Sequence, residues 1–296
     1  MEIRVLKYFL MAAREENITK AAKLLHLTQP TLSRQLMQLE EELGVKLFHR
    51  SKHRIILTED GLFLRRRAEE IVSLSEKTIE DFLHKKNHLS GRITVGSGEW
   101  QSSRFLAELI SAFQTKNPEV YFELYSSSSD NIKERIDRGS LDFGLLQEPI
   151  DISKYDFIRT PVRETWGILT SRNSSLASRE YVTPRDLTDM PLILPQRESL
   201  QKEVFNWFGS YRKKLKIAAT GNLLYNMAIL ARERKACVIT LNLDCSYEGL
   251  CFVPLFPPME AGTVLVWKKA QVFSPASSEF ISYLRKYISG INNDII

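Results

Sequence analysis

The segment from Ile18 to Arg54 constrains the fold more than any other stretch, because it orders two short helices, a tight turn and a basic hairpin. The first helix is apolar on one side, and Thr19 is its expected N-cap. Thr28 is the expected cap of the second helix. Pro30 falls in that helix's first turn, where a missing N–H is harmless. The order of cap, turn and second helix predicts a helix-turn-helix.

The second helix has an apolar back and a polar front. Leu32, Leu36 and Leu39 recur at helical spacing and are predicted to share one buried face. The outer face holds side chains suited to the DNA major groove, where Arg pairs with guanine and Gln with adenine. An amphipathic helix with a solvated polar face is the plainer alternative. The residues predicted to contact DNA from this segment are Thr28, Gln29, Pro30, Thr31, Ser33, Arg34 and Gln38.

The run AAKLLHLTQPTLSRQLMQLEEELGVKLFHR, followed by IILTEDG, resembles the winged helix-turn-helix of LysR-type transcriptional regulators. Individual residues match the family over residues 1–62. Over the rest of the chain, the length and the order of strands and helices agree more than individual residues do. The resemblance implies a double-stranded DNA operator, a small-molecule effector, a homodimer or dimer of dimers, and RNA polymerase as a candidate partner. The family often has basic residues where this chain has Met37 and Gln38. Fewer phosphate contacts and a weaker salt dependence are therefore expected.

A hairpin is predicted over Val45–Thr58, with basic side chains near its tip. As a wing, it would place these cations along phosphates or in the minor groove. Arg50, His53 and Arg54 are the predicted wing contacts. Residues 1–58 hold 10 Lys and Arg against 6 Asp and Glu, so most of the formal net charge of +5 lies in this segment. A basic solvated loop is the alternative, and the resemblance favours the wing.

Residues 59–90 predict a long amphipathic helix with a narrow apolar stripe. The stripe consists of Leu64, Ala68, Ile71, Ser75, Ile79 and Phe82. Such a stripe suits a two-helix seam between copies of the chain, although it could instead pack on the chain's own domain. The resemblance implies dimerisation, which would place two reading helices on a two-fold-related operator.

After a break at 87–91, strands and helices alternate, which predicts an α/β fold with a mostly parallel sheet. The resemblance implies two lobes like those of periplasmic binding proteins, with crossings near Glu148–Thr160 and Gly262–Lys268. The predicted domains are an all-α winged helix-turn-helix at 1–58, a linker helix at 59–90 and a two-lobed effector domain at 91–296. Lobe I comprises about 91–161 and 268–296, and lobe II about 162–267.

The effector is expected where strands end and helices begin, because backbone N–H groups point outward there. The predicted contacts are Ser97, Gly98, Glu99, Trp100, Gln101, Ser102, Ser103, Ser127, Ser128, Gln147, Gln196, Arg197 and Asn222. Trp100 would supply an apolar wall and Arg197 would hold a carboxylate by two hydrogen bonds. Together with Glu99, this suits a small organic or amino acid. An N-cap is an equal alternative for Ser102 or Ser103, a simple loop is an equal alternative for Ser126–Ser129, and Arg197 could instead be solvated.

The positions of the histidines and the absence of long apolar runs argue against several other classes of protein. All five histidines precede residue 91, so the α/β half cannot hold a Ser–His–Asp triad or a His-ligated metal. We therefore expect no enzyme, no metal and no cofactor, although a carboxylate-only or Lys-based enzyme remains open. The charged N-terminus is no signal peptide, and no apolar run could cross a membrane. A cytoplasmic protein is expected, which argues against an exported solute-binding protein.

Three cysteines without CxxC spacing argue against a disulfide framework or a zinc ribbon. A redox switch through Cys237 and Cys245 is an alternative that keeps the DNA role. Cysteines buried in strands are usually inert, which favours the small-molecule effector.

Overall fold

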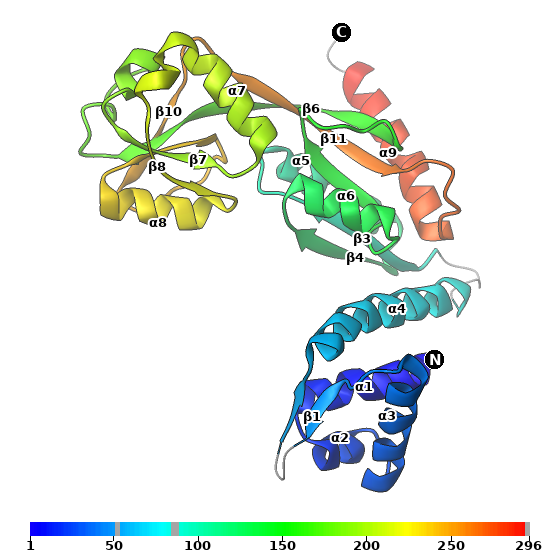
Figure 1. Ribbon diagram of the computed structural model, residues 1–296. Coiled ribbons are helices and arrows are strands. Elements are labelled where there is room, and N and C mark those ends of the chain that lie inside the picture. The colour runs from blue at the N-terminus through cyan, green and yellow to red at the C-terminus, as the bar shows by residue number, and fades with distance from the viewer. Residues whose placement is uncertain (51–53, 84–88, 294–296) are drawn as a thin grey trace. The chain divides into compact units, whose positions relative to one another are not determined.

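Apolar residues at helical spacing fold the first part of the chain around one core. The computed structural model describes residues 1–50, 54–83 and 89–293, and the chain forms two compact units, Met1–Lys86 and Asn87–Ile296 (Figure 1). Unit 1 contains α1 (Ile3–Glu15), α2 (Ile18–Leu24), α3 (Gln29–Leu43), β1 (Phe48–Arg50), β2 (Ile55–Leu57) and α4 (Glu59–Leu83). The predicted leucines Leu32, Leu36 and Leu39 are buried in its core, which confirms the apolar back of α3.

The ends of α2 and α3 are determined by capping. Asn17, not Thr19, is the N-cap of α2, because its side chain accepts a hydrogen bond from the Lys20 backbone N–H at 2.9 Å. The prediction for Thr19 was therefore wrong by two residues. The cap of α3 was predicted correctly, since Thr28 Oγ1 accepts from the Thr31 N–H at 3.4 Å. Gly44, at φ +69°, ends α3 in the left-handed conformation that glycine favours.

The apolar stripe of α4 divides between two environments. Leu64 and Ala68 are buried and belong to the core that α1, α2 and α3 share. Further along the helix, Ile71, Leu74 and Ile79 are 37%, 49% and 55% exposed. The first half of α4 therefore packs on its own unit, and the second half presents apolar side chains outward.

Unit 2 is built on one long mixed sheet. Its strands are β3 (Gly91–Ser97), β4 (Val120–Ser126), β5 (Phe143–Gln147), β6 (Tyr155–Ser171), β7 (Pro191–Pro195), β8 (Lys216–Gly221), β9 (Cys237–Leu241), β10 (Leu250–Pro254) and β11 (Glu260–Lys268). The strand order is β4-β3-β5-β11-β6-β9-β7-β8, and β10 pairs with β6. The expectation of a mostly parallel sheet was wrong, because β6 and β11 run antiparallel to each other and to their other neighbours.

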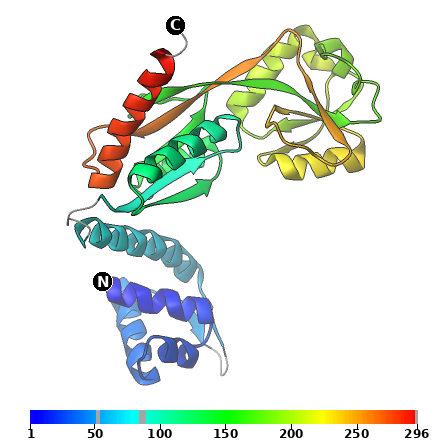
Figure 2. The same cartoon turned by 180° about the vertical axis from the view of Figure 1, so that it is seen from behind.

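Helices cover both faces of each half of the sheet (Figures 1 and 2). They are α5 (Ser102–Lys116), α6 (Ser129–Asp137), α7 (Glu198–Phe208), α8 (Leu224–Arg234) and α9 (Pro275–Asn293), with 3-10 turns at Pro184–Leu187 and Gly209–Lys214. In lobe I, α5 and α9 share one apolar core and α6 another. In lobe II, α7 and α8 likewise contribute to separate cores.

The two lobes are joined by the paired strands β6 and β11, which extend from one lobe into the other (Figure 1). The final helix α9 packs in lobe I, as the resemblance implied. Two features were not predicted from the sequence: the full length of β6, 17 residues, and the strand β10. Both are set by pairing with distant strands, which local patterns do not report.

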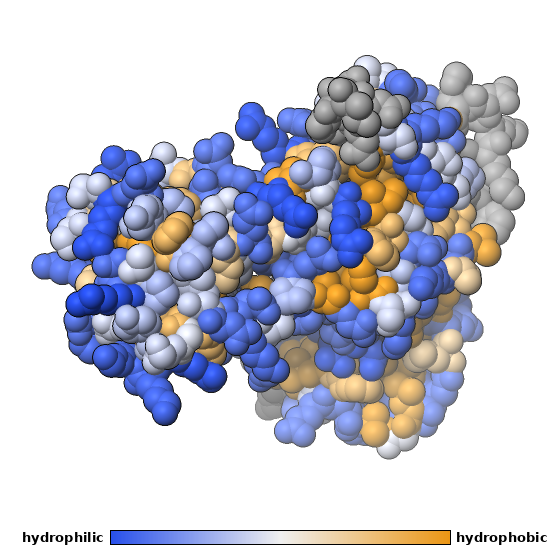
Figure 3. Space-filling model, turned by 90° about the horizontal axis from the view of Figure 1, so that it is seen from above, coloured by the Kyte–Doolittle hydropathy of each residue, from blue (hydrophilic) through white to orange (hydrophobic). Residues whose placement is uncertain are grey.

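The surface is mostly hydrophilic in the view of Figure 3, with apolar side chains gathered in limited areas. Over the residues that the structure describes, no helix combines the length and apolarity that a membrane span requires.

Candidate functional site

The outward face of α3 is accessible, as the spacing of its leucines predicted. The residues on or near it that are exposed are Thr28, Gln29, Pro30, Thr31, Arg34, Met37 and Gln38, and Ser33 is half-buried. Within the described residues, Arg34 has no ion pair or hydrogen bond. Its guanidinium is therefore available to an outside partner such as a guanine edge.

Two short contacts order other side chains on this face. The hydroxyls of Thr28 and Thr31 lie 2.8 Å apart and share a hydrogen bond. Gln35 Nε2 donates to Gln38 Oε1 at 3.1 Å. This bond holds the oxygen in place, although Gln38 as a whole is exposed. The face is thus partly ordered by the chain itself.

Glu40 joins α3 to the start of the wing, a role that its place in the acidic run Glu40–Glu42 did not reveal. Its buried carboxylate accepts hydrogen bonds from the backbone N–H groups of Leu47 at 2.9 Å and Phe48 at 3.3 Å, and from Lys46 Nζ at 3.2 Å. Burial opposes ionisation, but these donors outweigh it, so the pKa of Glu40 is lowered. A charged Glu40 therefore positions β1 against α3.

The wing starts as the predicted hairpin, with Phe48 opposite Leu57 and Arg50 opposite Ile55. Arg54 forms an ion pair with Glu16, its Nε lying 2.5 Å from Glu16 Oε2. His53 and the side chain of Arg50 lie outside the described residues. Gly61 is needed behind the hairpin, because a Cβ there would lie 2.2 Å from the Leu47 carbonyl oxygen.

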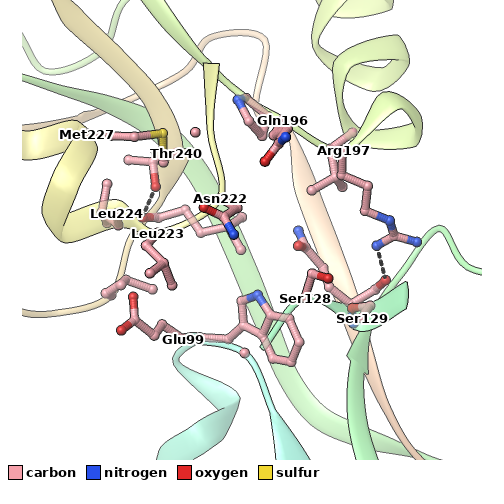
Figure 4. A pocket seen from close by; sticks show the side chains of 18 of the residues that line it. Glu99, Ser128, Ser129, Gln196, Arg197, Asn222, Leu223, Leu224, Met227 and Thr240 are labelled. Carbon is pink, nitrogen blue, oxygen red and sulfur yellow. Dashed lines mark hydrogen bonds between the residues drawn. The ribbon is translucent and has the colours of Figure 1, made fainter. Parts of the chain in front are cut away.

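Unit 2 holds a pocket of about 140 Å³ between the two lobes (Figure 4). Segments from both lobes line it, and Figure 4 shows Ser128 and Ser129 facing Gln196, Arg197 and Asn222. Nine of the predicted effector contacts line this pocket: Gly98, Glu99, Trp100, Ser127, Ser128, Gln147, Gln196, Arg197 and Asn222.

The remaining four predicted contacts lie elsewhere. Ser97 and Ser103 line a neighbouring hollow and bond to their own loop, each hydroxyl donating to the Gly98 carbonyl at 2.8 Å and 3.2 Å. Gln101 and the fully buried Ser102 line neither hollow. This loop also needs Gly98, since a Cβ there would lie 2.4 Å from the Trp100 ring.

A buried carboxylate occupies the N-terminus of α5. Glu164 on β6 accepts hydrogen bonds from the backbone N–H groups of Gln101 at 3.0 Å and Ser102 at 2.9 Å, and from the Ser102 hydroxyl at 2.5 Å. Glu164 is fully buried. The first turn of α5 is thus bound by the chain's own anion, which anchors the strand that joins the lobes.

Arg197 connects the lobes. Its two terminal nitrogens donate to the carbonyl oxygens of Gln147 at 3.2 Å and Pro149 at 2.9 Å, and its Nε lies 3.5 Å from Asp130 Oδ2. Burial lowers the pKa of Arg197, and Asp130 opposes that effect. Arg197 therefore lines the pocket, but its guanidinium is directed at protein oxygens.

Much of the pocket wall is apolar and was not singled out from the sequence. These residues are Trp166, Leu200, Leu223, Leu224, Met227, Ile239, Leu241 and Leu243. Each lies in or beside a strand or helix where an apolar residue is the expected core residue. Sequence alone therefore offers no signal that separates these residues from ordinary core.

The cysteines do not form a pair. All three are free: Cys237 is buried, Cys245 exposed and Cys251 half-buried. Burial raises the pKa of the Cys237 thiol, although the Thr170 hydroxyl opposes the shift, and a raised pKa disfavours the reactive thiolate. Over the part of the chain that the structure describes, no cluster of three or more His, Cys, Asp or Glu residues could hold a metal ion.

Two family models match the chain. Residues 3–62 match "Bacterial regulatory helix-turn-helix protein, lysR family", and residues 86–289 match "LysR substrate binding domain". The second match alone covers more than half of the chain, so it identifies the family.

Individual relatives agree. The chain is 32% identical over 255 residues to the HTH-type transcriptional regulator AlsR of Bacillus subtilis, covering 86% of this chain and 80% of AlsR. It is 25% identical over 304 residues to the Hca operon transcriptional activator HcaR of Escherichia coli, covering 98% and 99%. The crystal structure of full-length CbnR complexed with its target DNA has a TM-score of 0.78 at 23% identity, covering 97% of this chain and 99% of that one. This last likeness concerns the fold.

Proposed function

This chain belongs to the LysR family of DNA-binding transcriptional regulators, and we propose that it reads its operator with α3 and senses an effector in the interlobe pocket. The observation that supports the first part is the combination of a buried leucine row with an exposed polar face on one helix. The second part is supported by nine predicted contacts, drawn from segments far apart in sequence, that line one pocket.

The residues that contact base edges are Gln29, Thr31, Ser33 and Arg34, since the N-terminal residues of a recognition helix lie against the bases in the major groove. Thr28, Pro30 and Gln38 border this set and contact the DNA backbone or the groove wall. On the wing, Arg50, His53 and Arg54 lie along phosphates or the minor groove. Arg54 then exchanges its ion pair with Glu16 for a phosphate contact.

The operator-bound form is a homo-oligomer joined through the second half of α4. The exposed side chains of Ile71, Leu74 and Ile79 support this, because a row of large apolar residues at helical spacing suits a helix of a second copy. Replacing Ile79 with Glu is expected to shift the chain toward monomer in analytical ultracentrifugation.

Effector binding stabilises one closure of the two lobes and so changes how dimers are arranged on the operator. Met227→Trp tests the pocket by filling it, because Met227 lines its wall. We expect this variant to keep operator binding and to lose the response to effector. Equal effector responses of Met227→Trp and wild type would remove the pocket from the proposal.

Arg34→Ala tests the reading face. On an operator recovered by in vitro selection, we expect a loss of about 1–3 kcal/mol of binding free energy at fixed salt, with relaxed preference at one base position. Arg104→Ala is the matched control, because Arg104 is 80% exposed on α5 in unit 2 and its loss changes the net charge equally. Unchanged operator affinity for Arg34→Ala would contradict this assignment.

A further inference from the structure

The pocket contains a buried hydrogen-bond donor that no described residue satisfies. Gln147 is only 3% exposed and lines the pocket. Its side-chain Nε2 has no hydrogen-bond partner among the described residues. A buried donor without a partner destabilises the fold, so such a group at a binding site points to a ligand that supplies the acceptor.

Two helix N-termini add further donors at the same place. Of the helices that start near the cleft, α5 is bound by Glu164 and α6 is capped by Ser128. Each of α7 and α8 is 11 residues long, and neither has a side-chain cap. Among the described residues, no side chain caps their first-turn N–H groups, and each helix start carries a partial positive charge of about half a unit. Leu200 and Leu224 of these first turns line the pocket, whereas Glu198 and Ser199 of α7 line a separate hollow.

Hydrogen bonds connect the segments that carry these donors. Arg197, the N-cap residue of α7, donates to the Gln147 carbonyl, which brings the start of α7 beside Gln147. The Gln196 N–H donates to the Gly221 carbonyl at 2.8 Å, which ties the approach to α7 to the approach to α8. Asn222 and Leu223, just before α8, line the same pocket.

The charges at the pocket select the kind of acceptor. Arg197 is directed at the carbonyl oxygens of Gln147 and Pro149 and is paired with Asp130, so it is not free to clamp a ligand. The partial positive charge of the two helix starts favours a single negative charge, as the start of α5 favours the carboxylate of Glu164. Glu99 on the lining is exposed and disfavours a second negative charge.

The apolar part of the pocket wall determines the size and polarity of the rest of the ligand. Trp100, Trp166, Leu200, Met227 and Leu241 give it an apolar surface. A volume of about 140 Å³ is close to that of an engineered cavity of about 150 Å³ known to hold benzene. The rest of the ligand therefore has the size of about one six-membered ring.

We propose that the effector is a small monocarboxylate with a ring-sized apolar body, whose carboxylate accepts hydrogen bonds from Gln147 Nε2 and from the first turns of α7 and α8. This rests on the proposed function of the pocket. Neutral donors, not the guanidinium of Arg197, recognise the carboxylate.

The first test is calorimetric titration of the wild-type full chain with three probes that share a cyclohexane ring. They are cyclohexanecarboxylate, its primary amide and cyclohexane-1,2-dicarboxylate. We expect the monocarboxylate to bind at least about tenfold more tightly than either of the others, since a hydrogen bond to a charged group is worth about a factor of ten or more. Equal or tighter binding of the amide or the dicarboxylate would overturn the proposal. So would the absence of monocarboxylate binding at millimolar concentration.

The second test identifies the donor. Gln147→Leu is expected to weaken monocarboxylate binding by about tenfold or more and to affect the amide less, because the charged acceptor forms the stronger hydrogen bond. The control is Gln114→Leu, which removes a half-buried amide that donates to the Val120 carbonyl away from the pocket. Unfolding temperatures of both variants show whether they fold. Monocarboxylate affinity unchanged in a folded Gln147→Leu would assign recognition elsewhere.

The outcomes separate the two proposals. Operator binding is measured without any probe, so its failure would count against the proposed function whatever the pocket binds. A chain that binds its operator and responds to an amide in the pocket would keep the proposed function and overturn only the carboxylate.

Discussion

The proposed reading face of α3 and the proposed effector pocket between the lobes are built in opposite ways. The reading face comes from one stretch of eleven residues, Thr28 to Gln38, whose polar groups are mostly exposed. The pocket draws on segments spread from Gly98 to Leu243, and some of its polar side chains, among them Ser129, Arg197 and Thr240, already bond within the chain. A surface for a large polyanion can be local because DNA supplies the opposing wall. A pocket that excludes water must be assembled from distant parts.

The difference also appears in what holds each site in place. The reading face depends on a row of buried leucines directly behind it, whereas the pocket depends on polar contacts between lobes, through Glu164 and Arg197. Loss of apolar packing should therefore damage the first site, and loss of a polar anchor the second.

The largest effect is expected for Leu36→Ala. Leu36 is fully buried, so the substitution should destabilise unit 1 by about 2–5 kcal/mol and abolish operator binding without altering probe binding in unit 2. The neighbouring Met37, 40% exposed, is the control, and Met37→Ala should change the stability by less than about 0.5 kcal/mol. Urea unfolding of the full chain measures both. Similar stabilities for the two variants would show that the buried leucines do not hold the exposed face of α3 in place.

Glu164→Ala should have the next largest effect and should act on unit 2. Removing the carboxylate leaves the buried N–H groups at the start of α5 without an acceptor, at a cost of about 1–3 kcal/mol in unfolding free energy. The control Glu108→Ala removes a carboxylate that is 60% exposed on the same helix and should change little. If Glu164→Ala leaves the unfolding of unit 2 unchanged, then the carboxylate does not anchor β6.

Asn17→Ala should be smaller, at about 1 kcal/mol, because it removes the side-chain cap of α2. Thr19→Ala is the matched comparison two residues later, at an exposed position, and should be nearly neutral. Both are measured by thermal unfolding. The reverse order of effects would restore Thr19 as the cap.

The smallest effect is expected for Glu40→Gln, and it should disappear in acid. The pKa of Glu40 is lowered in the folded chain, so its carboxylate stabilises unit 1 fully above the ordinary glutamate value of 4.5. That contribution is lost as the pH falls below 4.5 through the folded pKa. Glu40→Gln should therefore be less stable than wild type near neutral pH, with the difference shrinking as the pH is lowered. A difference that does not change with pH would mean that the charge of Glu40 is not what holds the wing.

The reading face, the capping of α3 by Thr28, the break at Gly44 and the succession of strands and helices could be predicted from the sequence. In each case the signal lies within about one helix length: leucines at helical spacing, a cap residue or a glycine at the required position. Nine of the thirteen residues predicted to contact an effector line the pocket, because loops after strands and before helices gather at one edge of an α/β sheet.

Only the tertiary structure decided what those side chains do. Arg197 bonds across the lobes, Ser102 is bound to Glu164, Glu40 bonds to the start of the hairpin, and the buried Nε2 of Gln147 has no partner among the described residues. The hydrogen-bond partners of Arg197 lie 48 and 50 residues away along the chain, and Glu164 lies 62 residues from Ser102. Local periodicity and capping carry no information at that range, because which donor meets which acceptor depends on how β6 and β11 bring the lobes together.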